Sequence, residues 1–328
     1  MTAPGDGQRP CPERIVRIFG GREVGMGFFN RARRDLRQNG PVYLLIVPAL
    51  LFYIIFCYWP IYGQVIAFKD FSPAKGILGS PWAGMKHFMT FFSSRYFWQL
   101  ITNTLMINVY QLVFAFPMPI LLALMLNEVR NLRFKRTIQT LSYMPHFISL
   151  VVVCGLILDF TQVDGVINQL IVFFGGNPIQ FFLIADWFRP MYTITNIWQG
   201  IGWSSIIYIA ALSNIDMALY EAADMDGAGR WRKMLHVSLP GILPIISILL
   251  IMQMGQMMSV GFEKIILLYN PMIYDTADVI STFVYRKGLL EMNYSYSAAV
   301  GVFNSLINVA LLCIANVLSK RVSGSGLW

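Results

Sequence analysis

The sequence predicts an all-α polytopic membrane protein with six transmembrane helices, and two observations carry this prediction. Hydrophobic residues make up 56% of the 328 residues and charged residues only 13%, and the mean hydropathy is +0.57. This composition is too apolar for an ordinary soluble domain. Six stretches without Asp, Glu, Lys or Arg reach the ~20 residues that a helix needs to cross the hydrocarbon core. These stretches are residues 42–68, 101–126, 137–158, 191–212, 242–262 and 298–318.

Residues 165–185 are the one ambiguous part of this pattern. Their two apolar runs, residues 166–174 and 179–184, are short and are separated by Gly-Gly-Asn-Pro. A re-entrant or interfacial hairpin fits them better than a seventh span. Within the first two spans, kinks are predicted at four prolines, because proline removes a backbone donor and clashes with the preceding turn. They are Pro48, Pro60, Pro117 and Pro119.

The distribution of basic residues predicts the orientation. With six spans and the N-terminus inside, 17 of the 25 Lys and Arg residues fall on the inner side and 8 on the outer side. Inner loops of bacterial membrane proteins carry such an excess, so both termini are expected in the cytoplasm. A seventh span would move the charged loop at residues 213–241 and the C-terminal bases outside, which is a second argument against it.

The chain is expected to have two parts. Residues 1–40 form a cytoplasmic or interfacial N-terminal segment without a secretory signal, in which residues 14–19 and 31–37 resemble basic segments that lie on the inner leaflet. For residues 1–12 a disordered tail fits equally well. Residues 41–328 form the six-helix domain. The net charge of +8 follows largely from the inside–outside asymmetry, so no nucleic-acid partner is expected.

The sequence lacks the residues that several other functions require. The six spans contain none of the Asp, Glu, Lys or Arg side chains that mark proton relays or ion paths, which disfavours a proton-coupled symporter or a charged channel filter. No phosphate-binding loop is present, so the chain itself is not expected to hydrolyse nucleotide. The three histidines and four cysteines are widely spaced, and neither a metal site, a bound cofactor nor a catalytic constellation is predicted.

The spans carry uncharged polar and aromatic side chains that suit a sugar. Amides form hydrogen bonds with hydroxyl groups, and aromatic rings stack on the C–H faces of sugars. The alternative is that these residues only form hydrogen bonds between helices, worth roughly 0.6–2 kcal/mol each. The candidate substrate path consists of Asn196, Gln199, Trp203, Gln253 and Asn304.

The loop at residues 213–241 is a charged island between two apolar spans and is predicted to form helix, turn and helix. Asp216 or Asn214 is expected to cap the first helix, Gly227 to end it in the left-handed conformation, and residues 230–235 to restart it before Leu239-Pro240 delivers the chain to the next span. Glu221 would share a helical face with Met217 and Asp224. This face suits docking on a soluble partner. The alternative is an amphipathic helix on the membrane, which its acidic face disfavours.

Residues 221–240 read Glu-Ala-Ala-x3-Gly-x9-Val-x-Leu-Pro. This pattern resembles the signature loop of the permease subunits of binding-protein-dependent ABC importers, in which isoleucine stands at the position of Val237. In that family the loop forms the coupling helix that docks on the ATPase subunit. The resemblance implies an ABC importer type I permease fold, with a cytoplasmic coupling helix. Its coupling positions would be Glu221, Ala222, Ala223, Asp224, Gly227, Leu239 and Pro240.

Shorter motifs between about residue 41 and the C-terminus resemble the carbohydrate-uptake branch of this family. Among them are Tyr143-Met-Pro-His-Phe-Ile-Ser149, Ile197-Trp-Gln-Gly200, Gly261-Phe-Glu-Lys264 and Leu268-Tyr-Asn-Pro271. They are similar to permeases for oligosaccharides of complex polysaccharides, a group that includes the larger permease subunit of alginate importers.

This resemblance implies a non-catalytic subunit in a bacterial inner membrane. Its partners would be a second homologous permease in a heterodimer, two ATPase subunits that bind ATP and Mg, and a periplasmic or extracytoplasmic solute-binding protein. The implied function is ATP-driven oligosaccharide import. Two alternatives remain: a secondary transporter or channel subunit for a neutral solute, and a scaffold subunit that lines no path.

Overall fold

The structure, a computed structural model, describes residues 38–323. The predictions for the N-terminal segment therefore lie almost entirely outside the described residues. All regular elements in the described range are helical, apart from one isolated bridge between Lys69 and Trp82. The chain divides after Tyr62 into two compact units. The first unit contains α2 (Gly40–Phe52), which continues through a π-helical segment (Tyr53–Tyr58) into a 3-10 segment (Trp59–Phe68).

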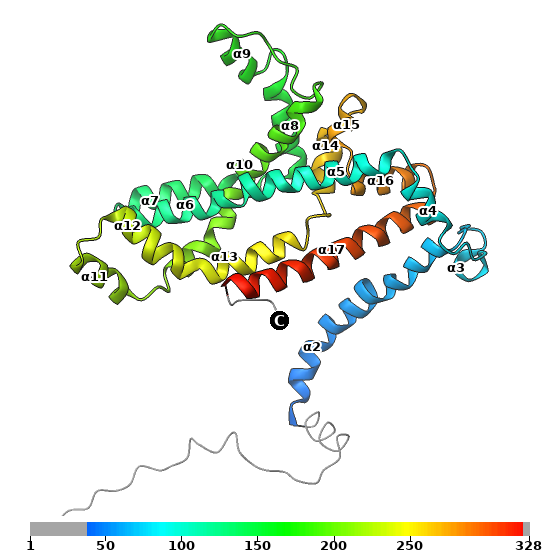
Figure 1. Cartoon of the computed structure of the whole chain (residues 1–328), viewed down its shortest axis with the longest axis horizontal. Helices are drawn as coiled ribbons and strands as arrows, with labels where there is room; N and C mark the ends of the chain where they lie inside the picture. Colours follow the sequence, from blue (N-terminus) through cyan, green and yellow to red (C-terminus); the bar gives the residue numbers. More distant parts are fainter. Residues whose placement is uncertain (1–37, 324–328) are drawn as a thin grey trace, which may run out of the picture. The chain divides into compact units, whose positions relative to one another are not determined.

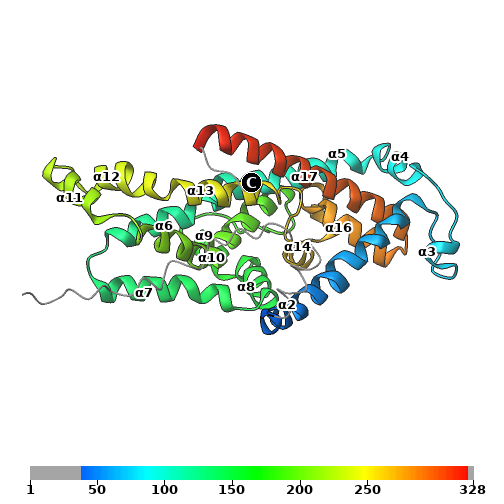
Figure 2. The same cartoon turned by 90° about the horizontal axis from the view of Figure 1, so that it is seen from below.

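Long helices lie side by side in the second unit (Figure 1). α5 and α6 together form one rod, with α13 and α17 beside it, and α10 packs against α6. α11 and α12 lie at one end of this bundle and α4 and α16 at the other, in both views (Figures 1 and 2). The elements are α3 (Gly76–Gly79), α4 (Lys86–Phe92), α5 (Tyr96–Tyr110), α6 (Pro117–Glu128), α7 (Leu132–Tyr143), α8 (Leu150–Thr161), α9 (Val166–Phe173), α10 (Ala185–Leu212), α11 (Met217–Met225), α12 (Arg230–Lys233), α13 (Leu239–Met254), α14 (Phe262–Leu268), α15 (Tyr274–Ala277), α16 (Ile280–Tyr285) and α17 (Tyr294–Ser323).

Five helical stretches of the described chain are long and apolar enough to span a membrane. They are Gly40–Phe68, Tyr96–Glu128, Leu150–Phe173, Arg230–Met254 and Tyr294–Arg321. A sixth results if α10 and α11, which meet at an angle of 75°, are counted as one broken span. The all-helical prediction is therefore confirmed, with five to six spans.

The prediction of one continuous third span at residues 137–158 is wrong. α7 ends at Tyr143, a 3-10 turn at Met144–Phe147 follows, and the new helix α8 begins after Ser149. Pro145 lacks the N–H that a continuing helix needs. The Ser149 side chain then accepts a hydrogen bond from the Val152 N–H at 3.4 Å and so caps α8. The apolar stretch was continuous in composition, but its backbone hydrogen bonds were not.

No separate seventh spanning helix occurs between residues 165 and 185. α9 is followed by an irregular segment that leads to α10. The fully buried side chain of Asn168 in α9 joins the two sides of this hairpin through hydrogen bonds. The Asn168 amide donates to the carbonyl oxygens of Gln162 at 2.7 Å and Ile179 at 2.8 Å, and accepts from the Ile179 N–H at 2.7 Å. By length and composition, α8 and α9 together count as one candidate span.

The prediction of the fifth span was misplaced at both ends. α13 ends at Met254, and α14 is a separate helix that starts at Phe262. At the other end the span begins at Arg230, because α12, a π-helical turn (Met234–Ser238) and α13 form one run. Leu239 and Pro240 thus lie inside a helix and do not link the loop to the span. The run continues through Pro240 because the Leu239 N–H bonds to the carbonyl of Met234, five residues back, in the wider π geometry.

The same π-type hydrogen bond, from an N–H to the carbonyl five residues back, precedes two other prolines. The Trp59 N–H bonds to the Ile54 carbonyl before Pro60, and the Phe116 N–H bonds to the Gln111 carbonyl at 2.8 Å before Pro117. The stretches Gly40–Phe68 and Tyr96–Glu128 each count as one helix. The predicted disturbances at these prolines are therefore local π-helical turns, which interrupt the α-helical pattern without ending the span.

Candidate functional site

A cavity of about 650 Å³ lies between α10, α13 and the helix formed by α5 and α6. The buried cluster beside it includes Ala123 of α6, Tyr208 of α10 and Ile242 of α13. On α5–α6, the π-helical turn at Gln111–Ala115 lies at the cavity, with both end residues in its wall. A π turn rotates the following side chains relative to a regular α-helix, and here it coincides with the point at which the helix lines the cavity.

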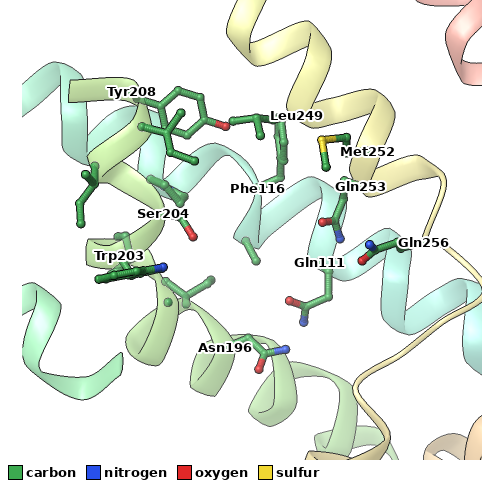
Figure 3. A pocket seen from close by; sticks show the side chains of 17 residues that line it. Gln111, Phe116, Asn196, Trp203, Ser204, Tyr208, Leu249, Met252, Gln253 and Gln256 are labelled. Carbon is green, nitrogen blue, oxygen red and sulfur yellow. The ribbon is translucent and has the colours of Figure 1, made fainter. Parts of the chain in front are cut away.

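The cavity wall has a polar side and an aromatic side (Figure 3). The amide side chains of Gln111, Asn196, Gln253 and Gln256 gather on one side, with Trp203 and Tyr208 on the other. The Trp203 ring is held in place by stacking on His146, with ring centroids 4.6 Å apart. Donors and acceptors facing a fixed ring can bind a ligand that has hydroxyl groups and C–H faces.

The structure brings together four of the five predicted path residues. Asn196, Trp203 and Gln253 line the 650 Å³ cavity, and Gln199 lines an adjoining cavity of about 340 Å³. Asn304 of α17 lines neither, and its side-chain oxygen is buried without a hydrogen-bond partner among the described residues. Gln111 completes the polar wall. It was visible in the sequence as a polar residue of the second span but was not assigned to the path.

The adjoining cavity contains a residue that the sequence interpretation missed, Lys264 of α14. This side chain is buried, with 4% of its surface exposed. Its ammonium group donates hydrogen bonds to Asn196 Oδ1 at 2.6 Å and Gln199 Oε1 at 3.2 Å, two residues of the predicted path. The two cavities share Gln111, Asn196 and Gln253, so Lys264 stands at the polar end of one continuous wall.

With the fifth apolar stretch at residues 242–262, the sequence places Lys264 just beyond a span, among the eight outer Lys and Arg residues. The helix instead ends at Met254, and residues 255–261 fold the chain back so that α14 approaches α10. Asn308 of α17 fastens this turn by accepting from the Met258 N–H and donating to the Ser259 hydroxyl, both at 2.9 Å. Lys264 thus adds a charged group at this end of the cavity wall, although it lies outside the spanning helices.

Burial in this position lowers the pKa of Lys264 to about 8, because removal from water disfavours the charged form. The titratable groups around it are Tyr192 on α10, whose ring centroid lies 5.8 Å from the ammonium, Cys154 on α8, and the exposed Glu263 on α14. No acidic side chain among residues 38–323 lies within 4.0 Å of the ammonium. At neutral pH this is a buried cation held by neutral amides.

The second candidate site is the polar loop that contains α11. Asp216 caps the helix, with its carboxylate accepting from the Ala218 N–H at 3.0 Å, as expected. Glu221, Ala222 and Asp224 are exposed and Ala223 is partly exposed. Large apolar side chains are exposed beside them, namely Met217, Leu219 and Met225. The loop thus presents a short helix with an acidic and apolar face.

Gly227 ends α11 in the left-handed conformation, with φ of +71°. The Ala228 N–H bonds to the Ala223 carbonyl at 2.9 Å and the Gly227 N–H to the Asp224 carbonyl at 3.0 Å. This pair of bonds is the Schellman motif, whose C′ position glycine occupies without strain. The prediction that Gly227 terminates the first helix is confirmed.

Side-chain bonds tie α11 to the helix that follows. Lys233 forms an ion pair with Asp224 at 2.7 Å, and the Tyr220 hydroxyl bonds to that of the buried Ser238 at 2.8 Å. Gly241 packs so closely on Ile215 that an added Cβ would lie 2.6 Å from its Cδ1. The loop is therefore connected to the base of the helix that continues to Gln253 in the cavity wall. No cluster of three or more potential metal ligands occurs in the described part of the chain.

The sequence is similar to known transport proteins over most of its length. YteP of Bacillus subtilis (strain 168), a polygalacturonan/rhamnogalacturonan transport system permease protein, is 47% identical over 294 residues, which are 89% of this chain and 92% of YteP. LplB of the same organism is 45% identical with the same coverage.

Solved structures show the same fold. A chain in the crystal structure of a bacterial ABC transporter involved in the import of the acidic polysaccharide alginate is 41% identical, with a TM-score of 0.83. The match covers 89% of this chain and 99% of that chain. A second structure, of a bacterial alginate ABC transporter in complex with an alginate pentasaccharide-bound periplasmic protein, gives a TM-score of 0.84 at 41% identity, and covers 90% of this chain and all of that chain. The predicted type I permease fold is thereby confirmed.

The family described as binding-protein-dependent transport system inner membrane component matches residues 115–324, more than half of the chain. That match includes the α11 loop and almost all of the residues that line the two cavities. The chain therefore belongs to this family and is a multi-pass permease subunit of an ABC importer that works with a binding protein.

Proposed function

We propose that this chain is the permease subunit of an ATP-driven importer for oligosaccharides of acidic polysaccharides, and that its 650 Å³ cavity is part of the sugar path. The observation that carries this proposal is the cavity wall, in which four amide side chains lie on one side and the stacked ring of Trp203 on the other. Such a wall recognises hydroxyl groups and C–H faces at once. The printed substrates of the relatives, polygalacturonan or rhamnogalacturonan and alginate, support the acidic class.

The complex would contain a second homologous permease, two ATPase subunits and an extracytoplasmic solute-binding protein. The α11 loop docks on an ATPase subunit, with Glu221 facing basic residues of that subunit and the apolar side chains of Met217 and Met225 entering a groove. The ATPase subunits bind ATP and Mg. The inward excess of Lys and Arg supports a cytoplasmic position for this loop and for both termini.

Within this chain, the docked loop acts on the sugar path through the helix from Arg230 to Met254. Lys233 and Ser238, near the beginning of that helix, hold α11, and Gln253 near its end lines the cavity. Closure of the ATPase dimer would displace the loop and with it the cavity wall. The displaced wall would open the cavity to one side of the membrane and then to the other. Such a switch requires that the ATPase subunits make different contacts with the permease in the two conformations.

Reconstitution with the partner subunits tests the proposal. We expect uptake of oligogalacturonate or oligoalginate into proteoliposomes to require ATP and the solute-binding protein. Uptake that instead follows a proton or sodium gradient and ignores ATP would refute it and support a secondary transporter.

Single substitutions by alanine then test the path. Changes at Gln199, Trp203 and Gln253 should lower the ATP hydrolysis that is stimulated by sugar-loaded binding protein. Asn304→Ala should leave this stimulation unchanged, because Asn304 was predicted for the path but lines neither cavity. Normal stimulation in the Gln199, Trp203 and Gln253 variants, in complexes that still assemble, would mean that these residues do not form the path.

A further inference from the structure

We propose that Lys264 is the specificity-determining residue that receives the carboxylate of an acidic sugar unit inside the permease. The inference rests on the proposed function. It adds that the Lys264 ammonium is the group that distinguishes a uronate from a neutral sugar. The juxtaposition that points to it is a buried ammonium at the polar end of the cavity wall, in contact with two amide oxygens and with no acid.

A second, partly buried base in the same unit has the acidic partner that Lys264 lacks. Arg286 is ion-paired through its guanidinium to the carboxylate of Asp278, which is itself buried with 4% of its surface exposed. Arg286 therefore has its counter-charge within the fold. Lys264 is more deeply buried, with 4% of its surface exposed, and none of the acidic side chains among residues 38–323 lies within ion-pair distance of it.

An unpaired buried charge is costly unless it is compensated. The two amide oxygens compensate in part, since each accepts a charge-assisted hydrogen bond. An ammonium has three donors, and the structure shows acceptors for two of them. A carboxylate that enters the 340 Å³ cavity would supply both the third acceptor and the missing negative charge.

The neighbouring side chains fit a sugar whose carboxylate lies at Lys264. Asn196 and Gln199 fix the ammonium from α10, and Gln111 and Gln253, which are shared with the larger cavity, would bond the hydroxyl groups of the same or the next sugar unit. The exposed Glu263 also lines this cavity but does not reach the ammonium. The wall therefore combines one cation with several neutral amides, as a chain of uronate units requires.

A structural role for Lys264 is the alternative, because its two bonds also connect α14 to α10. Lys264→Gln keeps a side chain that can donate to Asn196 and Gln199 but removes the charge, and Lys264→Arg keeps the charge. Lys86→Gln is the matched control. It makes the same chemical change at a lysine that is exposed, pairs with Asp70 at 2.9 Å and lies outside both cavities.

The experiment compares oligogalacturonate with its carboxyl-reduced, neutral form. Uptake is measured in proteoliposomes with the solute-binding protein. Equilibrium dialysis on the purified permease–ATPase complex without that protein measures binding to the permease itself. We expect Lys264→Gln to weaken the binding and uptake of oligogalacturonate by roughly 10-fold or more, the factor that follows from the loss of one charge-assisted hydrogen bond.

In the same assays Lys264→Arg and Lys86→Gln should remain close to wild type, and the neutral oligosaccharide should bind equally to wild type and Lys264→Gln. Oligogalacturonate handling in Lys264→Gln that equals wild type would overturn the inference. Equal loss of the charged and the neutral sugar would also overturn it, because it would show a role in positioning α14. If the wild-type complex takes up no acidic oligosaccharide with ATP, the proposed function fails first and the inference fails with it.

Discussion

The turn at Gly227 allows a prediction whose size can be derived from the backbone. Gly227 has a φ of +71°, and a Cβ added there would meet no atom within 4 Å. The substitution Gly227→Ser therefore introduces no clash, only the cost of a left-handed residue, which is about 1–2 kcal/mol. If the free loop relaxes and the docked loop must keep its turn, docking on the ATPase weakens by a factor of about 5–30.

Gly229→Ser is the matched control in the same loop. Gly229 has an ordinary φ of −68° at the N-cap of α12, no atom lies near its Cβ position, and serine is favoured at an N-cap. The assay titrates the purified ATPase subunit onto the permease in nanodiscs and then measures ATP-driven uptake. Asparagine at position 227 should give an intermediate loss, because it tolerates the left-handed conformation better. Equal affinities for both serine variants would refute the reasoning that docking needs this turn.

Three further substitutions or conditions test the remaining parts of the argument. Glu221→Arg should abolish co-purification of the ATPase subunit and ATP-driven uptake while the permease still inserts, and normal uptake would contradict the docking surface. Because burial lowers the pKa of Lys264 to about 8, its charged fraction should fall from about 90% near pH 7 to about 10% near pH 9. Uptake of oligogalacturonate should fall with it, and Lys264→Arg should flatten that profile; an identical profile in both proteins would exclude this titration as the cause. Gly202→Ala should lower the midpoint of thermal unfolding, because its Cβ would overlap the Ser142 carbonyl of α7. Such overpacking lowers the free energy of unfolding by about 1–3 kcal/mol. Gly200→Ala on the same helix has open space and should not lower the midpoint; equal midpoints would contradict the predicted clash.

The α11 loop could be predicted in detail because its signals are local. An aspartate cap, a run of helix formers and a glycine that ends the helix all act through hydrogen bonds within a few residues. The structure places Asp216 and Gly227 in these roles. The end of the loop could not be predicted in the same way. Leu239-Pro240 resembles a break in the helix, and only a π-helical hydrogen bond lets the helix continue through it.

The third span shows how composition can mislead. Residues 137–158 contain no charge and are long enough to cross a membrane, so hydropathy alone joins them. Pro145 and the cap at Ser149 divide the segment into two helices. Both residues were visible in the sequence, and the order of proline followed by a serine cap was the signal that would have located the break.

The residues of the proposed sugar path could be predicted only in part, because they come from distant segments. Polar residues within apolar spans marked Asn196, Gln199 and Gln253. Lys264 could not be placed by the same rule, because it lies beyond the end of α13 and approaches α10 only through the fold of residues 255–261. No pattern within one segment encodes that return.

The unbroken helix from Arg230 to Met254 has a mechanical consequence. Its 25 residues rise about 1.5 Å each and give a rod roughly 36 Å long. We expect a tilt of about 5° at the Arg230 end to swing the far end by about 3 Å, the span of one hydrogen bond. A small rotation of the base is thus amplified into the making or breaking of a single contact at Gln253. A rod of this length acts as a lever arm, and the π-helical turn before Pro240 keeps it in one piece.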